Sequence, residues 1–204
     1  FEIEKIDLKK IRYYLLYGQN EGHKNQIIKE KFKKEYIDKT YSYEEADVLN
    51  NLENFYNNVL SKSFFENDKL VIINRATDKI NNIIEEIVEK DIDDLIIVLN
   101  SSSLEKKSKL RSLFEKNKKT ICVPFYEDND QTLNGIVNEF FRSKKIPISQ
   151  QVINLITGRC RGDRQNLYNE LEKIKNFAKN KNKIEVDDIL KLTNLAENYD
   201  ASEL

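Results

Sequence analysis

The sequence predicts an α/β fold, in which a parallel sheet carries helices on both faces and is followed by a small all-helical domain. Short apolar runs, mostly β-branched or aromatic, recur as far as Pro124, where the strand signal stops. Runs that are apolar on both faces are typical of strands in a doubly covered parallel sheet. The predicted strands are 13–17, 70–73, 95–99 and 121–123, with a further strand expected over 36–43.

The segments between these strands carry apolar residues at helical spacing. A stripe of this kind is what a helix needs in order to pack against a sheet. The stripes are Ile27, Ile28, Lys31 and Phe32; Val48, Leu49, Leu52, Phe55, Tyr56, Val59 and Leu60; Ile80, Ile83, Ile84, Ile87 and Val88; and Leu104, Leu110, Leu113 and Phe114. The alternation of strands and helices predicts right-handed crossovers between parallel strands.

The chain beyond Pro124 predicts a helical module. Asp163 is placed to cap one of its helices. The expected helices are 128–144, 149–161, 164–179 and 185–194. We therefore expect an α/β domain over 1–125 and a helical domain over 126–195.

Composition excludes several classes of protein. The 34 Lys and Arg residues against 35 Asp and Glu leave a net charge of −1, so no overall field draws the molecule onto nucleic acid or membrane. One His and two Cys are too few for a Cys₄ or Cys₂His₂ zinc site, and Cys122 and Cys160 lie in apolar stretches that predict buried, reduced thiols. No apolar run is long enough to span a membrane and no signal peptide opens the chain, so a soluble, cytoplasmic protein is expected. Met is absent even at position 1, which indicates a piece of a longer chain.

The segment from Gly18 to Asn25 follows the first strand and opens a helix, the context that a phosphate-binding loop requires. Laid on the pattern G-x-x-x-x-G-K-[ST], Gly18 and Lys24 match, but His23 replaces the second glycine and Asn25 replaces the hydroxyl that binds Mg²⁺. A Cβ keeps the backbone from wrapping closely around phosphates, and an amide is a weak substitute for the hydroxyl that binds Mg²⁺. We interpret the segment as a degenerate nucleotide site; the alternative is that Lys24 is a solvated charge.

The second strong strand ends without the acidic residues that an ATPase has there. Asn74 stands where an ATPase has the carboxylate that orders Mg²⁺, and Arg75 stands where it has the glutamate that activates water. A guanidinium cannot act as a general base, and a neutral amide holds Mg²⁺ weakly. Both halves of the catalytic apparatus are therefore missing together.

Three surface features remain. Lys106–Arg111, continued by Lys116, Lys118 and Lys119, could follow a phosphate backbone, although its helical spacing favours a solvated helix face. Arg159, Arg161 and Arg164 form a denser cluster, which is either a DNA or subunit contact or a helix cap. Adjacent residues on a helix point about 100° apart, so Phe64 and Phe65 are either core residues or a protruding hydrophobic wedge.

Together these segments resemble the delta subunit of the bacterial DNA polymerase III clamp loader. They occur in the order of that family and cover nearly the whole chain. Each segment alone is a weak match, but the set together is specific. The matching segments are Tyr13–Gly18, Leu60–Ile73, Lys106–Leu110, Gly162–Ile174, Lys183–Ile189 and Ala196–Asp200.

The resemblance implies an AAA+-like module that does not hydrolyse ATP, with no catalytic residue, metal or cofactor. It also implies that a hydrophobic pair wedges open the ring-shaped sliding clamp. That pair falls on Phe64 and Phe65, beside Ser63, although the family usually has an aliphatic residue at the first position. Residues 196–204 then begin a truncated helical collar domain.

The partners implied are the sliding clamp (beta subunit), the gamma/tau and delta prime subunits of the loader, and primer–template DNA within the assembled loader. No membrane partner is expected, and the location implied is the cytoplasm, in association with the nucleoid. Two alternatives remain. One is an active AAA+ ATPase with an atypical phosphate loop; the other is a basic-patch protein whose affinity for nucleic acid depends on salt.

Overall fold

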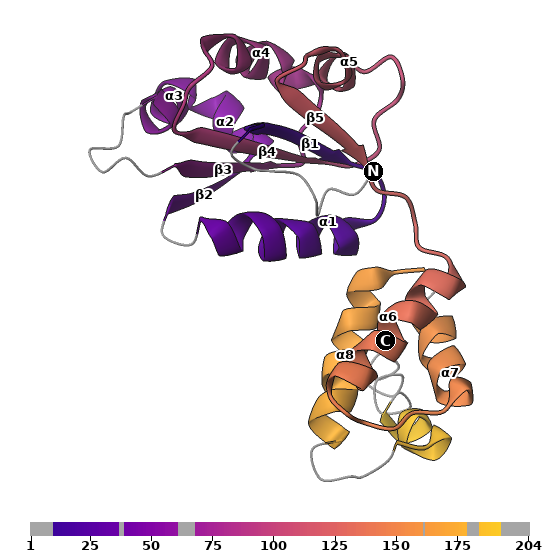
Figure 1. The fold of residues 1–204 in the computed structure, drawn as a ribbon. Helices are drawn as coiled ribbons and strands as arrows, with labels where there is room; N and C mark the ends of the chain where they lie inside the picture. The colour runs from indigo at the N-terminus through magenta and orange to yellow at the C-terminus, as the bar shows by residue number, and fades with distance from the viewer. Residues whose placement is uncertain (1–9, 37–38, 61–67, 161, 179–183, 193–204) are drawn as a thin grey trace, which may run out of the picture. The chain divides into compact units, whose positions relative to one another are not determined.

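The computed structural model describes residues 10–36, 39–60, 68–160, 162–178 and 184–192. The chain divides into two compact units between Tyr126 and Glu127. The first is an α/β unit and the second is helical (Figure 1). None of the described helices is long and apolar enough to cross a membrane.

Five parallel strands form the sheet of the first unit, in the spatial order β2-β3-β4-β1-β5. They are β1 (Tyr13–Tyr17), β2 (Thr40–Glu44), β3 (Lys69–Asn74), β4 (Leu95–Ser101) and β5 (Thr120–Pro124). The predicted fold class is confirmed, and β1 has the predicted bounds. The strand expected over 36–43 is wrong in its position, because the chain near Tyr36 is still helical and β2 begins at Thr40.

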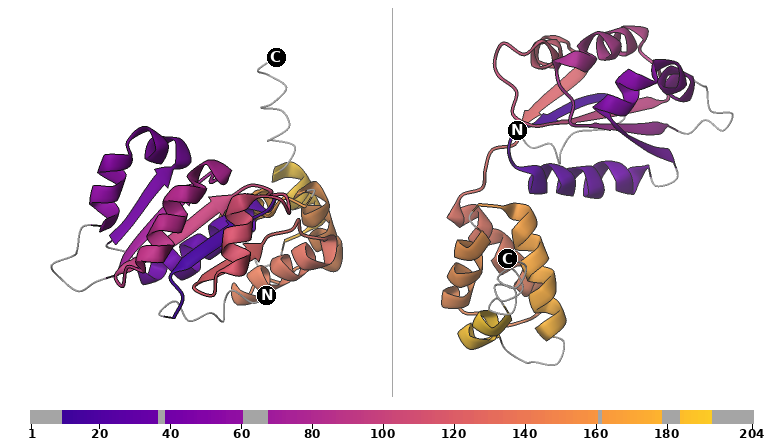
Figure 2. Two further views of the ribbon diagram at one scale, coloured as in Figure 1. Left: turned by 90° about the horizontal axis from the view of Figure 1, so that it is seen from above. Right: turned by 180° about the vertical axis from the view of Figure 1, so that it is seen from behind.

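Helices cover both faces of this sheet (Figures 1 and 2). One face carries α1 (Glu21–Ile27) and its π-helical continuation η2 (Ile28–Lys33). The other carries α2 (Glu45–Asn50), α3 (Leu52–Leu60), the short η4 (Asp78–Ile80), α4 (Asn81–Lys90) and α5 (Lys109–Lys116). Side chains alternate along β1: Tyr13 and Leu15 join the core beneath α2–α5, whereas Tyr14 and Leu16 join the core beneath α1.

This arrangement places β1 where the direction of winding reverses. The chain crosses one face from β1 to the edge strand β2, and then returns over the other face through β3 and β4 to β5. Right-handed crossovers require the helices to change face at this reversal. The carboxyl end of β1 is therefore the topological switch point, which is where open α/β sheets bind ligands.

The stripe expected over 48–60 is two helices instead of one. Asn51 interrupts it, because its side-chain Oδ1 accepts a hydrogen bond from the Asn54 N–H at 3.2 Å and so caps the start of α3. Within α3 only part of the predicted apolar stripe is buried. Leu52 and Leu60, predicted to be buried, are 39% and 37% exposed, whereas Phe55 and Val59 are buried as predicted.

The second unit packs three long helices around an apolar core. These are α6 (Asp130–Ser143), α7 (Gln150–Cys160) and α8 (Arg164–Ala178), and residues 186–192 are also helical. Asn129 caps α6, which explains why it begins two residues later than expected. The predicted cap at Asp163 is confirmed, since its Oδ1 accepts hydrogen bonds from the N–H groups of Gln165 and Asn166 at 2.8 and 3.0 Å.

The two thiols are protected by their surroundings. Cys160 is buried and Cys122 is partly buried. Burial raises the pKa of the Cys122 thiol to about 12 and that of Cys160 to about 11, so both remain protonated at neutral pH.

The hydroxyl of Tyr13 offers a test of how the sheet and α4 are joined. It donates to the main-chain oxygen of Ile87 at 3.4 Å and accepts from the N–H of Ile92 at 3.2 Å. We expect Tyr13→Phe to lower the free energy of unfolding by about 1 kcal/mol, because both groups lose their partner inside the protein. Thermal unfolding measures this. Tyr41→Phe, at an exposed tyrosine of β2, should leave stability unchanged, and equal effects of the two variants would contradict the assignment.

Candidate functional site

Gly18 leaves β1 with a backbone that favours glycine, at φ = +129°. Its N–H donates to the Ser102 oxygen at 3.2 Å. A Cβ at this position would lie 2.1 Å from the main-chain oxygen of Phe125, which follows β5. The glycine is therefore required by the close approach of another segment of the same chain.

Lys24 is buried with no exposed surface. Its Nζ donates to Glu21 Oε1 at 2.6 Å and to the main-chain oxygen of Ser101, at the end of β4, at 2.5 Å. A buried ammonium group needs such partners to offset its lost hydration. The alternative that Lys24 is a solvated charge is therefore wrong. A phosphate at this lysine would have to compete with the carboxylate of Glu21.

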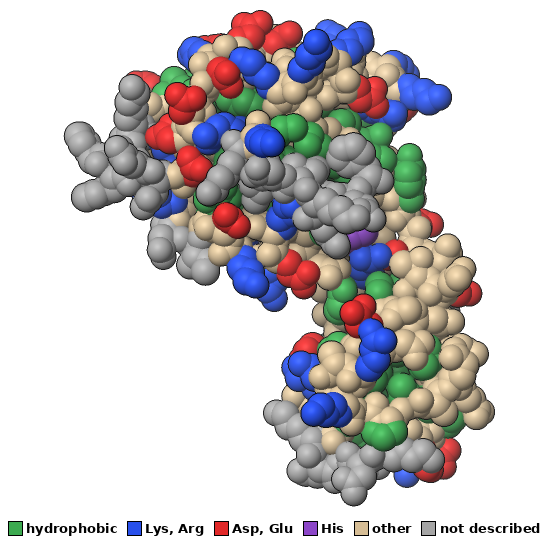
Figure 3. Space-filling view, in the orientation of Figure 1, with side chains coloured by type: hydrophobic (Ala, Val, Ile, Leu, Met, Phe, Trp, Pro, Cys, Tyr) green, Lys and Arg blue, Asp and Glu red, His purple; other side chains and the backbone are tan. Residues whose placement is uncertain are grey.

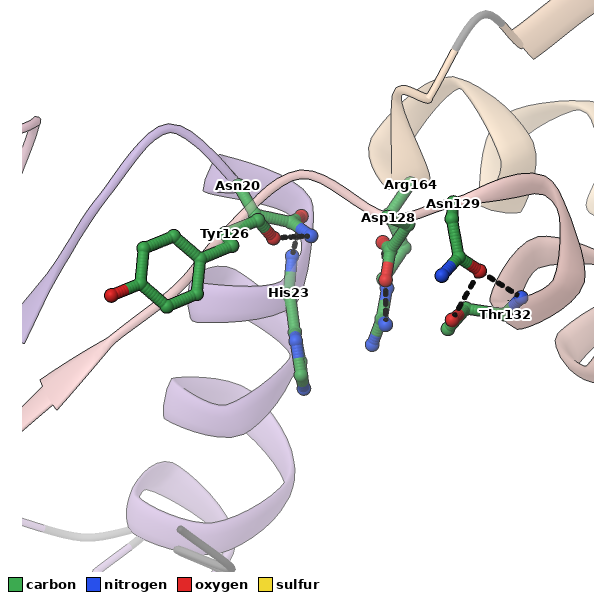
Figure 4. Close-up of polar contacts among 7 residues, drawn as sticks. All are labelled: Asn20, His23, Tyr126, Asp128, Asn129, Thr132 and Arg164. Atoms are coloured by element: carbon green, nitrogen blue, oxygen red, sulfur yellow. Dashed lines mark hydrogen bonds and ion pairs between the residues drawn. The ribbon is translucent and has the colours of Figure 1, made fainter.

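Other polar groups of the loop bind the segment after β5 (Figure 4). The N–H of Asn20 donates to the Phe125 oxygen at 3.3 Å, and its side-chain Nδ2 donates to the Tyr126 oxygen at 2.9 Å. Its Oδ1 accepts from the His23 N–H at 3.0 Å and so caps α1. The His23 ring packs edge-on against Phe125, with ring centroids 4.9 Å apart. Asn25, at the position of the magnesium-binding hydroxyl, is exposed.

Amide side chains meet at the ends of β3 and β4. Asn74 Nδ2 lies 3.2 Å from Ser42 Oγ, and Asn100 Nδ2 lies 3.5 Å from Asn74 Oδ1. Arg75 has φ = +54°, its side chain is 84% exposed, and its Nε lies 3.0 Å from Glu44 Oε2. A guanidinium has only donor groups, so Arg75 cannot accept a proton from a water molecule. Among the described residues, no group of three or more His, Cys, Asp or Glu side chains could hold a metal ion.

Comparison with known proteins assigns the chain to a family. A family model described as DNA polymerase III, delta subunit, matches residues 14–127. The chain belongs to this family. A comparison with curated proteins gave no match.

Solved structures agree with the fold of a delta-family chain. The Bacillus subtilis DNA clamp loader delta protein (YqeN) is similar with a TM-score of 0.56 and 16% identity, over 89% of this chain and 57% of that one. The RuvB Holliday junction branch migration motor of Thermotoga maritima gives a TM-score of 0.58 and 15% identity, over 92% and 64%. Domain III of the Thermotoga maritima replication initiation protein DnaA gives 0.53 and 12%, over 88% and 82%. The delta-family chain thus spans about three fifths of the clamp loader and RuvB structures, and the AAA+-like fold class is confirmed.

The basic stretch of this delta-family chain includes α5 (Lys109–Lys116) and the exposed turns before and after it. Several of its charges have local acidic partners: Lys107 pairs with Glu105 at 2.9 Å, and Lys119 pairs with Asp91 at 2.7 Å. In Figure 3 Lys and Arg side chains are interspersed with Asp and Glu along the upper surface, over α4 and α5. This mixture of charges is typical of a solvated surface, in agreement with the interpretation that the spacing favoured, although the stretch is only partly helical.

The described arginines of the predicted cluster differ in their burial. Arg164 is buried, and its guanidinium makes a two-pronged pair with Asp128, in which Nε donates to Oδ2 at 2.6 Å and Nη2 donates to Oδ1 (Figure 4). The pair occupies the Nε–Nη2 edge of the guanidinium inside the helical unit, which favours a structural role for Arg164. A DNA or subunit contact of Arg164 stays a prediction. Arg159 is half-buried, and Arg161 lies outside the described residues.

The predicted clamp-binding residues Ser63, Phe64 and Phe65 also lie outside the described residues. The chain is described up to Leu60, the end of α3, and again from Asp68, one residue before β3. The site prediction for these residues therefore stays a prediction.

Sequence reasoning missed three polar residues of the carboxyl edge. Asn100 directly follows the predicted strand 95–99, as Asn74 follows 70–73, so the same argument could have found it. Glu21 lies three residues before Lys24, a spacing that brings side chains together on a helix. Buried Glu45, whose carboxylate accepts from the N–H and hydroxyl of Thr77 at 2.7–3.0 Å, carries no such signal.

Removal of the Lys24 ammonium group tests whether it serves the fold or a ligand. We expect Lys24→Met to lower the free energy of unfolding by about 1–3 kcal/mol, because the buried oxygen of Ser101 loses its donor. Thermal melting with and without ATP and Mg²⁺ measures both roles. Lys29→Met, at an exposed lysine of η2, is the control and should melt like the unaltered chain. A saturable rise in melting temperature with ATP that Lys24→Met abolishes would contradict the interpretation.

The Arg164–Asp128 pair makes a separate prediction about the helical unit. Arg164→Ala should destabilise it by about 3–5 kcal/mol, because the buried carboxylate of Asp128 loses both of its bonds to the guanidinium. The double variant Arg164→Met, Asp128→Leu should cost less than the single variant, since no charge is stranded. Urea unfolding provides the measurement. A stable Arg164→Ala chain that binds DNA more weakly would contradict the structural role and support the surface role.

Proposed function

We propose that this chain is a non-catalytic subunit of the DNA polymerase III clamp loader, which binds the sliding clamp and opens its ring for loading onto primed DNA. Membership of the delta-subunit family supports the clamp-loader role. The observation that carries the non-catalytic part is the internal pairing of Lys24 with Glu21 and Ser101.

The hydrogen bonds of the phosphate loop support this proposal. Gly18, Asn20 and Lys24 direct their donors to oxygens of the chain itself, at Ser102, Phe125, Tyr126 and Ser101. Catalysis of phosphoryl transfer depends on donors and a metal ion arranged around the phosphates. Neutral Asn74 and ion-paired Arg75 replace the acidic groups that this chemistry requires. The chain therefore works, in this proposal, through binding alone.

Ring opening by binding has a thermodynamic condition. A protein without a chemical energy source shifts a partner between closed and open states only by binding the open state more tightly. The delta chain would supply that differential affinity through Phe64 and Phe65. The gamma/tau and delta prime subunits and primer–template DNA complete the proposed set of partners.

Truncation of the aromatic pair tests the proposal. We expect Phe64→Ala and Phe65→Ala each to weaken clamp binding by about 2–4 kcal/mol, roughly 30- to 1,000-fold, with little change in melting temperature. Phe65 should carry the larger share, because one ring of such a pair is usually more buried than the other. Clamp affinity and thermal melting are measured side by side on both single variants and the double variant.

Leu52→Ala is the matched control, since Leu52 is an exposed apolar residue on the helix that precedes this segment. It should change neither quantity. Core residues would behave in the opposite way, because Phe→Ala in a core costs about 3–5 kcal/mol of stability. A double variant that melts lower and binds the clamp as before would refute the assignment.

A further inference from the structure

The segment that follows β5 is fixed to the α/β unit as far as Tyr126. Phe125 is 3% exposed in the core beneath α1, and its N–H donates to the Tyr17 oxygen at 2.7 Å. Asn20, which is itself buried, holds the next two carbonyl groups: its N–H donates to the Phe125 oxygen at 3.3 Å, and its Nδ2 donates to the Tyr126 oxygen at 2.9 Å (Figure 4). The loop after β1 therefore binds the main chain of this segment.

The helical unit fixes the chain again at Asp128, only two residues later. The Asp128 side chain is 6% exposed and accepts a hydrogen bond from Arg164 Nε of α8 at 2.6 Å. The next residue, Asn129, caps α6, because its Oδ1 accepts from the Thr132 N–H at 2.8 Å. Asp128 is thus held by α8 through its side chain and by α6 through the residue that follows it.

Glu127 stands alone between these two anchors. It is exposed, and it makes no hydrogen bond or ion pair with any residue that the structure describes. Because peptide groups are planar, each residue contributes only two soft dihedral angles, φ and ψ. A change of orientation between the units is therefore taken up mainly by the two angles of Glu127. Its Cβ excludes much of the φ/ψ space that a glycine could use, so this link is short and restricted.

From these contacts we infer that Glu127 is a single-residue hinge between the two units, and that Asn20 confines the motion to it. A hinge consists of a few loop residues that absorb a change in φ and ψ between parts that stay rigid. The Asn20 side chain extends the rigid part of the α/β unit by one peptide group beyond Phe125. The loop after β1 thereby serves as an anchor for its own chain. The inference rests only on contacts within each unit and holds whether or not the chain binds a clamp.

The N–H of Glu127 reports on this anchor, because it shares a planar peptide group with the Tyr126 oxygen that Asn20 binds. Order parameters from ¹⁵N relaxation of the complete chain measure its motion. In the unaltered chain we expect a value of about 0.85, as in rigid backbone, and in Asn20→Ser a value below about 0.6. Serine keeps an oxygen that can cap α1, so the variant removes the Nδ2 donor without removing the cap.

Asn25→Ser is the matched control, since Asn25 is an exposed asparagine of the same helix. It should leave the order parameter of the Glu127 N–H unchanged. A value that stays at about 0.85 in Asn20→Ser would overturn the inference. A value already below about 0.6 in the unaltered chain would also overturn it, because the anchor would then be absent.

Two variants of Glu127 test the hinge itself, and they keep the inference testable should Asn20→Ser fail to fold. Residual dipolar couplings of the backbone amides measure how strongly each unit aligns, and two units that move as one body align equally. Glu127→Gly should lower the alignment of one unit relative to the other, because glycine opens further φ/ψ space to the hinge. Glu127→Ala keeps the Cβ and should leave the ratio of the two alignments as in the unaltered chain. Equal ratios in the two variants would overturn the inference.

Discussion

The buried ammonium group of Lys24 is the interaction on which the carboxyl edge of the sheet depends. A lysine without exposed surface must find charge-assisted partners inside the protein, and Lys24 finds them on its own helix at Glu21 and across the sheet at Ser101. These bonds draw the loop after β1 toward the end of β4. The close approach of Phe125 to Gly18 and the bonds from Asn20 to residues 125 and 126 then join the loop to the end of β5. One loop thus ties together three adjacent strand ends.

This constraint divides the sheet into two edges with different properties. At the carboxyl edge the groups that meet are neutral amides, a lysine with internal partners and an ion-paired arginine. At the amino edge, Lys69 donates to main-chain oxygens at the end of α3, and Asp68 pairs with Arg12. Each edge uses a buried lysine to fix main-chain oxygens.

The parts of the fold that could be predicted from sequence are those fixed by local pattern. Strands such as 13–17 and 95–99 are buried on both faces, so unbroken apolar runs identify them. The edge strand β2 is partly exposed, with Tyr41 facing solvent. Its apolar pattern is therefore weaker, and the strand was predicted at the wrong position. The stripe over 48–60 was broken by one side chain, since the capping bond of Asn51 outweighed an otherwise continuous periodicity. Partners far apart in sequence were beyond the same reasoning: Asp128 lies 36 residues before Arg164, and Ser101 lies 77 residues after Lys24. No spacing rule links such positions.

Charge balance connects the altered loop with the altered strand end. In a phosphate-binding loop the lysine is neutralised by its ligand, and the ligand in turn is neutralised by Mg²⁺ held at a neighbouring strand end. With Asn74 at that strand end, a triphosphate beside Lys24 would bring its charge toward the carboxylate of Glu21 with little to hold a balancing metal ion. The carboxylate of Glu21 neutralises Lys24, so the lysine needs no anionic ligand. The same negative charge would repel a phosphate that approached it. In the proposed function, ring opening therefore depends on tighter binding of the open state of the clamp and not on a bound nucleotide.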